Sequence, residues 1–169
     1  MSLNIHTFAL GPLENKTYLL SDSQTKQAAL MDPSFGIQAV LRYAREQALD
    51  IRQVWLTHAH FDHISGVAEV VGALSPAVTV GLHAEDLPLW NMKGGAAAFG
   101  FSMELDLQPN LFFTHGQLLE LGAVRVQVRH APGHTPGHVV FYEAESGIAL
   151  CGDVIFQGSI GRTDLPGGS

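Results

Sequence analysis

Residues 57–63 read Thr57-His58-Ala59-His60-Phe61-Asp62-His63, directly after the apolar, strand-like run Val54-Trp55-Leu56. Three histidines and one aspartate therefore stand within a single short segment. Imidazole nitrogen and carboxylate oxygen are ligands of zinc and similar divalent ions. Four ligands this close together are more than one closed zinc site uses comfortably. The spacing predicts two neighbouring metal ions, which together can ionise a water molecule between them. The first two histidines would face one ion, and the last two residues of the heptapeptide would face the other.

Two later segments carry ligand types that such a pair of metals would still need. Residues 132–138 read Pro-Gly-His-Thr-Pro-Gly-His, and residues 151–153 read Cys-Gly-Asp. His134 lies in a Gly/Pro turn, which fixes the backbone around a ligand. Asp153 follows the apolar run 148–150 after a glycine that permits close backbone approach. We therefore expect distant residues to complete the metal shell.

These motifs, taken in this order together with Gly161-Arg162-Thr163-Asp164, resemble those of the metallo-β-lactamase-fold hydrolases. The likeness runs from about Ile5 to the last residue and is strongest to the compact glyoxalase II-type branch, the hydroxyacylglutathione hydrolases. The resemblance implies an α+β fold, the αββα sandwich, formed by a single metallo-β-lactamase-like domain over residues 1–169.

The resemblance also implies how the metals are held. The implied ligands are His58, His60 and His134 for the first ion, Asp62 and His63 for the second, and Asp153 as a bridge between both. Two divalent ions are implied, with zinc expected first and iron or manganese as alternatives. By the same resemblance, the protein is a hydrolase that cleaves a thioester such as S-lactoylglutathione through a metal-bound hydroxide. Asp62 is the implied catalytic residue, because it can also orient the hydroxide.

Arg162 is the candidate for binding the substrate. Similar enzymes use a basic residue here for a carboxylate of the glutathione moiety, and a guanidinium suits two-point binding of a carboxylate. A structural ion pair with Asp164 is the equal alternative. The expected partner is a small-molecule thioester linked to glutathione.

Other residues are candidates for supporting the metal ligands, because metal-bound histidines usually donate their other N–H to a carboxylate or carbonyl. Asp32, at the end of the strand-like run 28–31, fits this role, and a turn cap before Pro33 is its structural alternative. Further candidates are Thr57, Thr135 and His138. Four histidines match no ligand position and are expected to be surface or packed residues: His6, His83, His115 and His130. Cys151 is expected to be a small buried residue.

Composition narrows the class of protein. The 169 residues are 46% hydrophobic and 15% charged, which is typical of one well-packed globular domain. The net charge of −7, without a basic run, argues against a nucleic-acid partner. One cysteine, no signal-peptide pattern and no apolar run of about 18 residues predict a cytoplasmic protein without a membrane partner.

Periodicity indicates where the elements lie. Strands are predicted near residues 4–10, 16–21, 27–31, 53–57, 77–82, 123–130, 138–143 and 147–151. Helices are predicted near residues 36–48, 63–73 and 84–91, the last with Glu85 and Asp86 in its first turn. Residues 91–110 are rich in Gly, Ala, Met and Phe without a clear period. They are predicted to form either a surface loop packed on the core or a lid over the metal site.

The similar proteins carry one more histidine near the C-terminus, in a Gly-His-Gly-Pro-like turn. This sequence ends at Gly167-Gly168-Ser169 before any such segment. We therefore expect a chain truncated at its C-terminus, in which the second metal binds weakly. Apolar surface exposed by the truncation would favour a homodimer or lower the stability.

A mononuclear iron dioxygenase that acts on glutathione persulfide is the main alternative function. Proteins of that kind are similar in fold and share the Gly-Arg-Thr-Asp stretch. Their facial triad of two histidines and one aspartate corresponds here to His58, His134 and Asp153. They usually show Gly-His-Thr-Asp-Gly-Cys where residues 133–138 read Gly-His-Thr-Pro-Gly-His. A nuclease or a lactamase of the same fold is disfavoured by the lack of basic patches and of an export signal.

Overall fold

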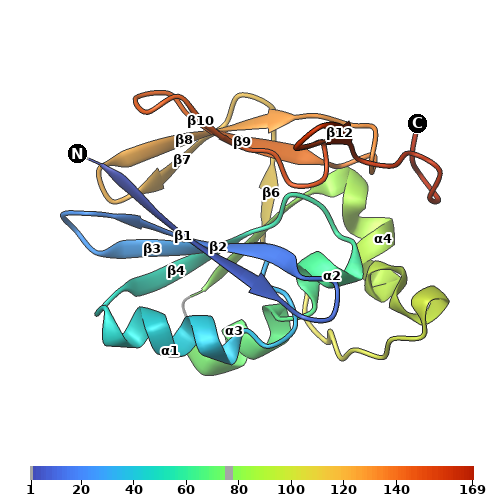
Figure 1. Cartoon of the computed structure of the whole chain (residues 1–169), viewed down its shortest axis with the longest axis horizontal. Helices are drawn as coiled ribbons and strands as arrows, with labels where there is room; N and C mark the ends of the chain where they lie inside the picture. Colours follow the sequence, from blue (N-terminus) through green and yellow to red (C-terminus); the bar gives the residue numbers. More distant parts are fainter. Residues whose placement is uncertain (1, 75–77) are drawn as a thin grey trace.

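The computed structural model describes residues 2–74 and 78–169, and its centre is a six-stranded sheet (Figure 1). The strands follow the order of the chain: β1 (Leu3–Leu10), β2 (Asn15–Asp22), β3 (Gln27–Met31), β4 (Asp50–Trp55), β5 (Thr79–His83) and β6 (Leu111–Phe113). The pairs β1–β2 and β2–β3 are antiparallel, whereas β3 to β6 run parallel to one another. The carboxyl ends of these four strands therefore meet at one edge of the sheet.

A second, antiparallel sheet packs against one face of the first. Its strands lie in the order β10 (Ile148–Leu150), β9 (Val139–Glu143), β8 (Val124–His130) and β7 (Leu118–Leu121). A short hairpin of β11 (Ile155–Phe156) and β12 (Ser159–Ile160) follows. The architecture confirms the predicted α+β sandwich.

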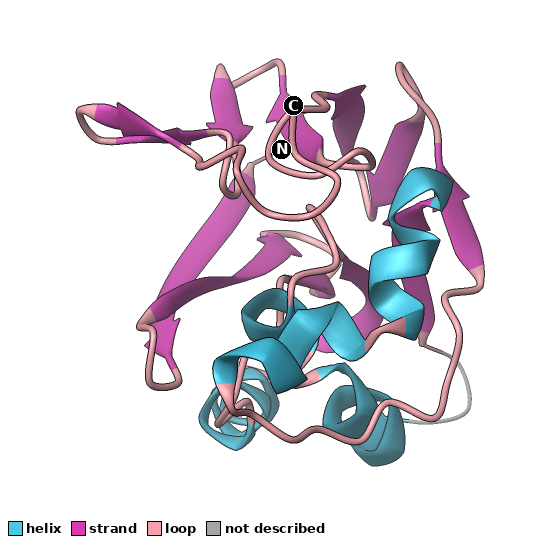
Figure 2. Cartoon of the chain, turned by 90° about the vertical axis from the view of Figure 1, so that its right-hand side faces the viewer, coloured by secondary structure: helices cyan, strands magenta, loops and turns pink. Residues whose placement is uncertain are grey.

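The helices lie mainly on one side of the molecule, as the two views show (Figures 1 and 2). They are α1 (Gln38–Glu46), α2 (Phe61–Ile64), α3 (Val67–Leu74), η1 (Ala84–Asp86), α4 (Leu87–Asn91) and η2 (Lys93–Phe99). Helices α1 and α3 cover the outer face of the six-stranded sheet (Figure 1). Over the outer face of the four-stranded sheet, the described residues place no helix (Figure 1). Among the described helices, none is long and apolar enough to cross a membrane.

The six-stranded sheet has a hydrophobic core on each face. In β3, Ala28 and Leu30 pack with the helices, whereas Ala29 and Met31 pack with Trp55 and the second sheet. Successive side chains of a strand point to opposite faces, so a strand covered on both sides is apolar at every position. This double burial explains why residues 28–31 form a continuous apolar run.

Most predicted strands agree with the structure to within a few residues, although the strand predicted near 77–82 begins at Thr79 and residue 77 lies outside the described residues. The single helix predicted near 63–73 is wrong, because Ser65 and Gly66 separate α2 from α3. Gly66 donates its N–H to the Pro33 carbonyl at 2.9 Å, and a side chain there would stand 2.6 Å from the Ser34 carbonyl oxygen. The close backbone approach at this point requires glycine.

Four strands and one helix were not predicted from the sequence: β6, β7, β11, β12 and η2. All of these elements are short, and η2 contains Gly94 and Gly95 with positive φ angles of 63° and 75°. Short elements with such interruptions leave no detectable period in the sequence.

Asp22, at the end of β2, ties the two sheets together. Its Oδ2 accepts hydrogen bonds from the Ala123 N–H at 3.0 Å and the Thr25 hydroxyl at 2.8 Å, and its Oδ1 accepts from the Gln24 N–H at 3.1 Å. The hydrogen bond from Ala123, with those of the neighbouring turn, lowers the pKa of Asp22 to about 2. The ionised carboxylate therefore stabilises the folded protein.

Replacing Asp22 with Asn should lower the free energy of unfolding at pH 7 by about 1–3 kcal/mol, because an amide NH₂ would face donors that now bind a carboxylate. Urea denaturation measures this difference. Since the folded pKa lies below the ordinary 3.8, the stabilisation is present above that pH and is lost as the pH falls through about 2. The difference between the two proteins should shrink accordingly. Asp50→Asn, at an exposed ion pair with Arg52, is the control, and an equal loss there would contradict the assignment.

Candidate metal centre

The predicted metal ligands meet at one rim of the sandwich. The segment 57–63 follows β4, His134 lies in the loop after β8, and Asp153 lies just after β10. Asp32 and Asp86 follow the parallel strands β3 and β5 at the same edge. Loops at the carboxyl ends of parallel strands commonly carry the functional residues of a sheet.

Three buried histidines form a first set of donors. Donor atoms of His58, His60 and His134 all lie within 4.8 Å of one another. His60 Nδ1 and His134 Nε2 face each other at 2.9 Å. His58 Nε2 is buried and has no hydrogen-bond partner among the described residues. Unpartnered imidazole nitrogens that converge in this way are typical of a metal site.

A second set of donors adjoins the first. His63 Nε2 lies 3.5 Å from Asp62 Oδ2 and 3.4 Å from Asp153 Oδ1. The other oxygen of Asp153 lies 3.5 Å from His134 Nε2, so this carboxylate stands between the two sets. Donors that share a tetrahedral zinc ion, at bonds of 2.0–2.2 Å, are about 3.4 Å apart. The residues fit divalent metal ions, and the structure brings together all six ligands predicted from the sequence.

The protonation of these groups also suits a metal. Burial lowers the pKa of His58 well below its ordinary value, and burial together with His134 lowers that of His60 to about 4. These imidazoles are therefore neutral at pH 7, as metal ligands must be. Burial opposes the charged form of His63 as well, but Asp32 raises the pKa of His63 well above its ordinary value. The carboxylates around His63 thus supply an excess of negative charge that a cation would balance.

Asp32 braces the metal-binding segment, as its sequence position predicts. Its Oδ1 accepts the Thr57 N–H at 2.8 Å, and its Oδ2 accepts the Thr57 hydroxyl at 2.7 Å and faces His63 Nδ1 at 3.0 Å. The Thr57 oxygen in turn lies 3.0 Å from His58 Nδ1. With Nδ1 engaged in each histidine, Nε2 is directed into the centre. Asp32 holds a left-handed φ of 49°, a strained conformation that is typical of functional positions.

The ligands from the second sheet are oriented by other contacts. His134 Nδ1 lies 2.7 Å from the Arg162 carbonyl oxygen, which accepts its N–H and frees Nε2 for the centre. His138 stacks on His58 with ring centroids 4.7 Å apart, and its Nε2 accepts the Asp153 N–H at 3.1 Å. His138 therefore fixes the backbone of the carboxylate that stands between the two donor sets.

Asp86 is a supporting residue that the sequence analysis missed, since its position predicted only a charge in a helical first turn. It is fully buried, and its Oδ2 accepts the Ala59 N–H and the Thr135 hydroxyl, both at 2.9 Å. Its Oδ1 accepts the Gly137 N–H at 2.7 Å. One carboxylate therefore links the loop of His58 and His60 to the loop of His134. The sequence shows only that Asp86 is an acidic residue soon after a strand. Such residues are too common for this position alone to have revealed its supporting role.

A third group of possible ligands lies outside the centre and consists of His83, Glu85 and His130. The two imidazole rings stack face to face, with centroids 4.1 Å apart and an angle of 13° between their planes. Lone pairs in two nearly parallel planes cannot converge on one ion unless a ring turns. These histidines are packed residues in the observed arrangement.

Two further predictions concern residues near the centre. Cys151, predicted to be buried, is partly exposed and lines a cavity together with His63 and Asp153, so that prediction was wrong. Arg162 forms the alternative ion pair, with both carboxylate oxygens of Asp164 accepting from its guanidinium at 2.7 and 2.8 Å. Both side chains of this pair are exposed.

A two-sheet α+β sandwich with a rim of histidines and aspartates defines a class of metal-binding protein. Residues 10–169 match the family model of the metallo-beta-lactamase superfamily. The chain belongs to this superfamily.

Relatives with several different names share the fold. Hydroxyacylglutathione hydrolase GloC of Haemophilus influenzae is 30% identical over 167 residues, which cover 98% of this chain and 78% of GloC. The solved structure of the BLEG-1 B3 metallo-beta-lactamase gives a TM-score of 0.88 at 32% identity and covers 98% of this chain and 79% of that one. The structure of TTHA1623 in a di-iron-bound form gives a TM-score of 0.85 at 37% identity and covers 96% of this chain and 79% of that one. The structure of ETHE1 from Myxococcus xanthus gives a TM-score of 0.76 at 25% identity and covers 98% of this chain and 64% of that one.

Replacing Asp86 with Asn should weaken metal binding by about tenfold or more, because an NH₂ group would meet N–H or O–H donors at the junction of the two ligand loops. Titration against a coloured chelator measures the affinity. The metal-free variant should also lose about 1–3 kcal/mol of stability in urea denaturation. Asp106→Asn, at an exposed aspartate, serves as the control. Unchanged metal affinity in Asp86→Asn would contradict the bracing role.

Proposed function

We propose that the protein is a metal-dependent hydrolase of thioesters, with glutathione-linked thioesters such as S-lactoylglutathione as the first substrates to test. The observation that carries the proposal is the pair of donor sets with Asp153 between them. Such a centre offers two adjacent cation positions, and a cavity adjoins each of them at His60 and His63. The likeness to hydroxyacylglutathione hydrolase GloC supports a thioester as substrate.

Three histidines, His58, His60 and His134, would hold one ion, and Asp62, His63 and Asp153 would hold the second. Zinc suits this mixture of imidazole and carboxylate, and iron or manganese are the alternatives. Such ions supply an ionised water and positive charge for the developing oxyanion.

The protein's own residues hold the reacting groups in place. Burial raises the pKa of Asp62, whose carboxylate faces His63 from the loop side of the centre. Its Oδ2 is placed to accept a hydrogen bond from the attacking water and so to orient it toward the acyl carbon. The Asn15 amide donates to the Asp62 carbonyl oxygen at 2.8 Å, which fixes this residue from β2. Because a water molecule attacks the acyl carbon in this proposal, no protein side chain has to act as the nucleophile.

A mononuclear iron dioxygenase for glutathione persulfide is the second candidate, and the likeness to ETHE1 favours it. His58, His134 and Asp153 would form its facial triad. His60, Asp62 and His63 then have no role as ligands, although their donors converge on the same centre. This surplus of ordered donors makes the two-metal hydrolase the better-supported reading.

Replacing His63 with Ala separates the two functions. For the hydrolase, elemental mass spectrometry should find about one ion fewer per chain, and thioester hydrolysis should fall at least about tenfold. For the dioxygenase, oxygen consumption with glutathione persulfide should persist, because His63 lies outside the triad. His58→Ala should abolish turnover in both cases. His83→Ala, outside both donor sets, should change neither metal content nor rate.

Replacing Arg162 with Gln tests the proposed binding of a substrate carboxylate. If the guanidinium leaves Asp164 to bind glutathione, KM for a glutathione thioester should rise several-fold with kcat little changed. A neutral thioester should show no such change. The backbone carbonyl that accepts from His134 is retained in the variant. Equal effects on both substrates would assign Arg162 to the structural ion pair alone.

A further inference from the structure

Two cavities of different character flank the metal centre, one lined mainly by apolar residues and the other by a mixture of polar and apolar residues. The first, the apolar cavity, has a volume of about 380 Å³ and reaches the centre at His60. Its walls include Leu89, Met92, Ala98, Phe99, Pro136 and Leu165. The second, the polar cavity, has a volume of about 320 Å³ and reaches the centre at His63 and Asp153. Its walls combine the polar residues Asn15, Lys16 and Gln157 with the apolar residues Leu150, Ile155 and Phe156, and it is called polar by contrast with the first.

The apolar cavity is built by close contact between η2 and the metal-binding segment. A side chain at Gly94 would stand 2.2 Å from the Phe61 backbone nitrogen, so the chain passes directly over this segment. The Phe99 ring stacks on Phe61 with centroids 5.3 Å apart. This arrangement holds an apolar wall beside His60, while Met103 and Leu105 from the same predicted segment, residues 91–110, pack into the core.

From these walls we infer that the apolar cavity binds the acyl chain of the thioester, and that the preferred substrates carry an unsubstituted aliphatic acyl group. The thiol half would lie toward the polar cavity. This inference rests on the proposed hydrolase function and names its substrate class. In the reaction, water adds oxygen to the acyl carbon, the C–S bond breaks, and the sulfur leaves as a thiolate that takes up a proton.

Charge supports this orientation of the substrate. Among the described residues, Glu85 is the only titratable residue besides His60 that lines the apolar cavity, and its carboxylate would repel the carboxylates of a glutathione moiety. The polar cavity contains Lys16, a cation that suits them, and a bound metal ion would balance the Asp32 and Asp153 carboxylates that also line it. A hydroxyl group on the acyl chain, as in a lactoyl thioester, would lose its hydration against apolar walls. An alkyl chain would gain, since each buried methylene group strengthens binding by about fourfold.

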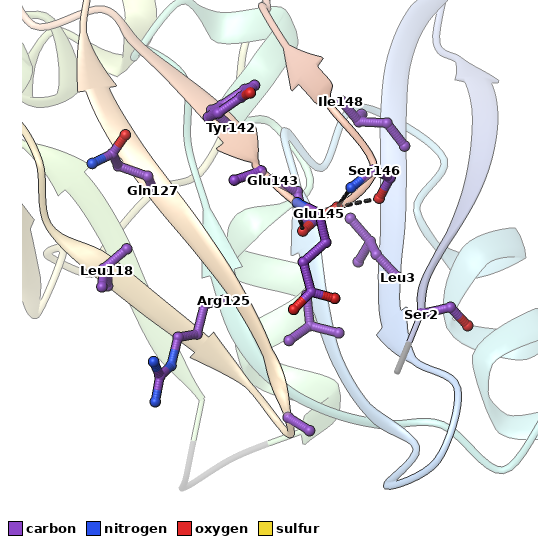
Figure 3. A pocket seen from close by; sticks show the side chains of 13 residues that line it. Ser2, Leu3, Leu118, Arg125, Gln127, Tyr142, Glu143, Glu145, Ser146 and Ile148 are labelled. Atoms are coloured by element: carbon purple, nitrogen blue, oxygen red, sulfur yellow. Dashed lines mark hydrogen bonds between the residues drawn. The ribbon is translucent and has the colours of Figure 1, made fainter.

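A larger cavity, of about 930 Å³, lies elsewhere, against β7 to β10 and the start of β1 (Figure 3). Its labelled side chains include Leu118, Arg125 and Tyr142, and none of the six metal ligands lines it (Figure 3). It therefore has no part in the reaction, and its exposed Leu118 provides a control position.

The inference is tested first with the metal-loaded protein and a series of glutathione thioesters that carry acetyl, butyryl, hexanoyl and lactoyl groups. kcat/KM should rise by at least about tenfold from acetyl to hexanoyl, and lactoyl should fall below butyryl. A flat series, or a preference for lactoyl, would overturn the inference and leave the proposed hydrolase intact. No hydrolysis of any thioester would instead overturn the proposed function.

Binding provides a readout that does not depend on turnover. S-hexylglutathione and S-methylglutathione are thioethers and cannot be hydrolysed. Calorimetric titration should show the hexyl compound bound at least about tenfold more tightly. Equal affinities would overturn the inference even if thioesters are cleaved.

Two pairs of variants locate the acyl chain. Ala98→Phe fills the apolar cavity and should lower kcat/KM for the hexanoyl thioester at least about tenfold while the acetyl thioester is spared. Ala97→Phe, the exposed neighbour that does not line the cavity, is its matched control. Met92→Gln should weaken S-hexylglutathione binding, whereas Leu118→Gln, at a similarly exposed apolar residue, should not. Identical behaviour within each pair would contradict an acyl chain in this cavity.

Discussion

The buried carboxylate of Asp32 is the constraint on which the metal centre depends. It accepts hydrogen bonds from the Thr57 N–H and hydroxyl and faces His63, so one side chain fixes the loop that carries four of the six predicted ligands. A buried charge is tolerated only where hydrogen bonds or a counter-charge satisfy it. The left-handed backbone at Asp32 costs free energy that the surrounding contacts must offset. Asp32 therefore connects the end of strand β3 to the loop 57–63 and to the orientation of the histidines in that loop.

Asp86 extends the same principle across the sandwich. It joins the loop after β4 to the loop after β8, and so places ligands from the two sheets against one another. The centre consequently forms only when the sheets are packed, and a metal bound there would stabilise that packing through its affinity for the folded state alone. The excess of negative charge around His63 also favours binding of a metal ion, because a cation would balance that charge.

The surroundings of the centre bear on selectivity more than its ligands do. Similar proteins carry different names, including a hydroxyacylglutathione hydrolase and a B3 metallo-beta-lactamase, so membership of the superfamily does not by itself assign a substrate. The apolar wall beside His60 and the mixed wall beside His63, which carries polar and charged residues, give the centre two unlike sides. A molecule with an apolar half and a charged half can be held in only one direction between them, because reversal would place charge against apolar walls.

The sequence by itself determined the superfamily and the sandwich architecture, and it predicted six candidate ligands that the structure brings together, because these depend on short motifs and on apolar runs that are local in the chain. It also indicated that Asp32 supports the ligands. Only the tertiary structure decided that Asp86 links two ligand loops, since its partners Ala59 and Thr135 lie 27 and 49 residues away in the chain. The break between α2 and α3, the partial exposure of Cys151 and the two cavities likewise depend on which distant segments meet. Contacts between distant segments follow from packing, and packing has no period or spacing that a single sequence displays.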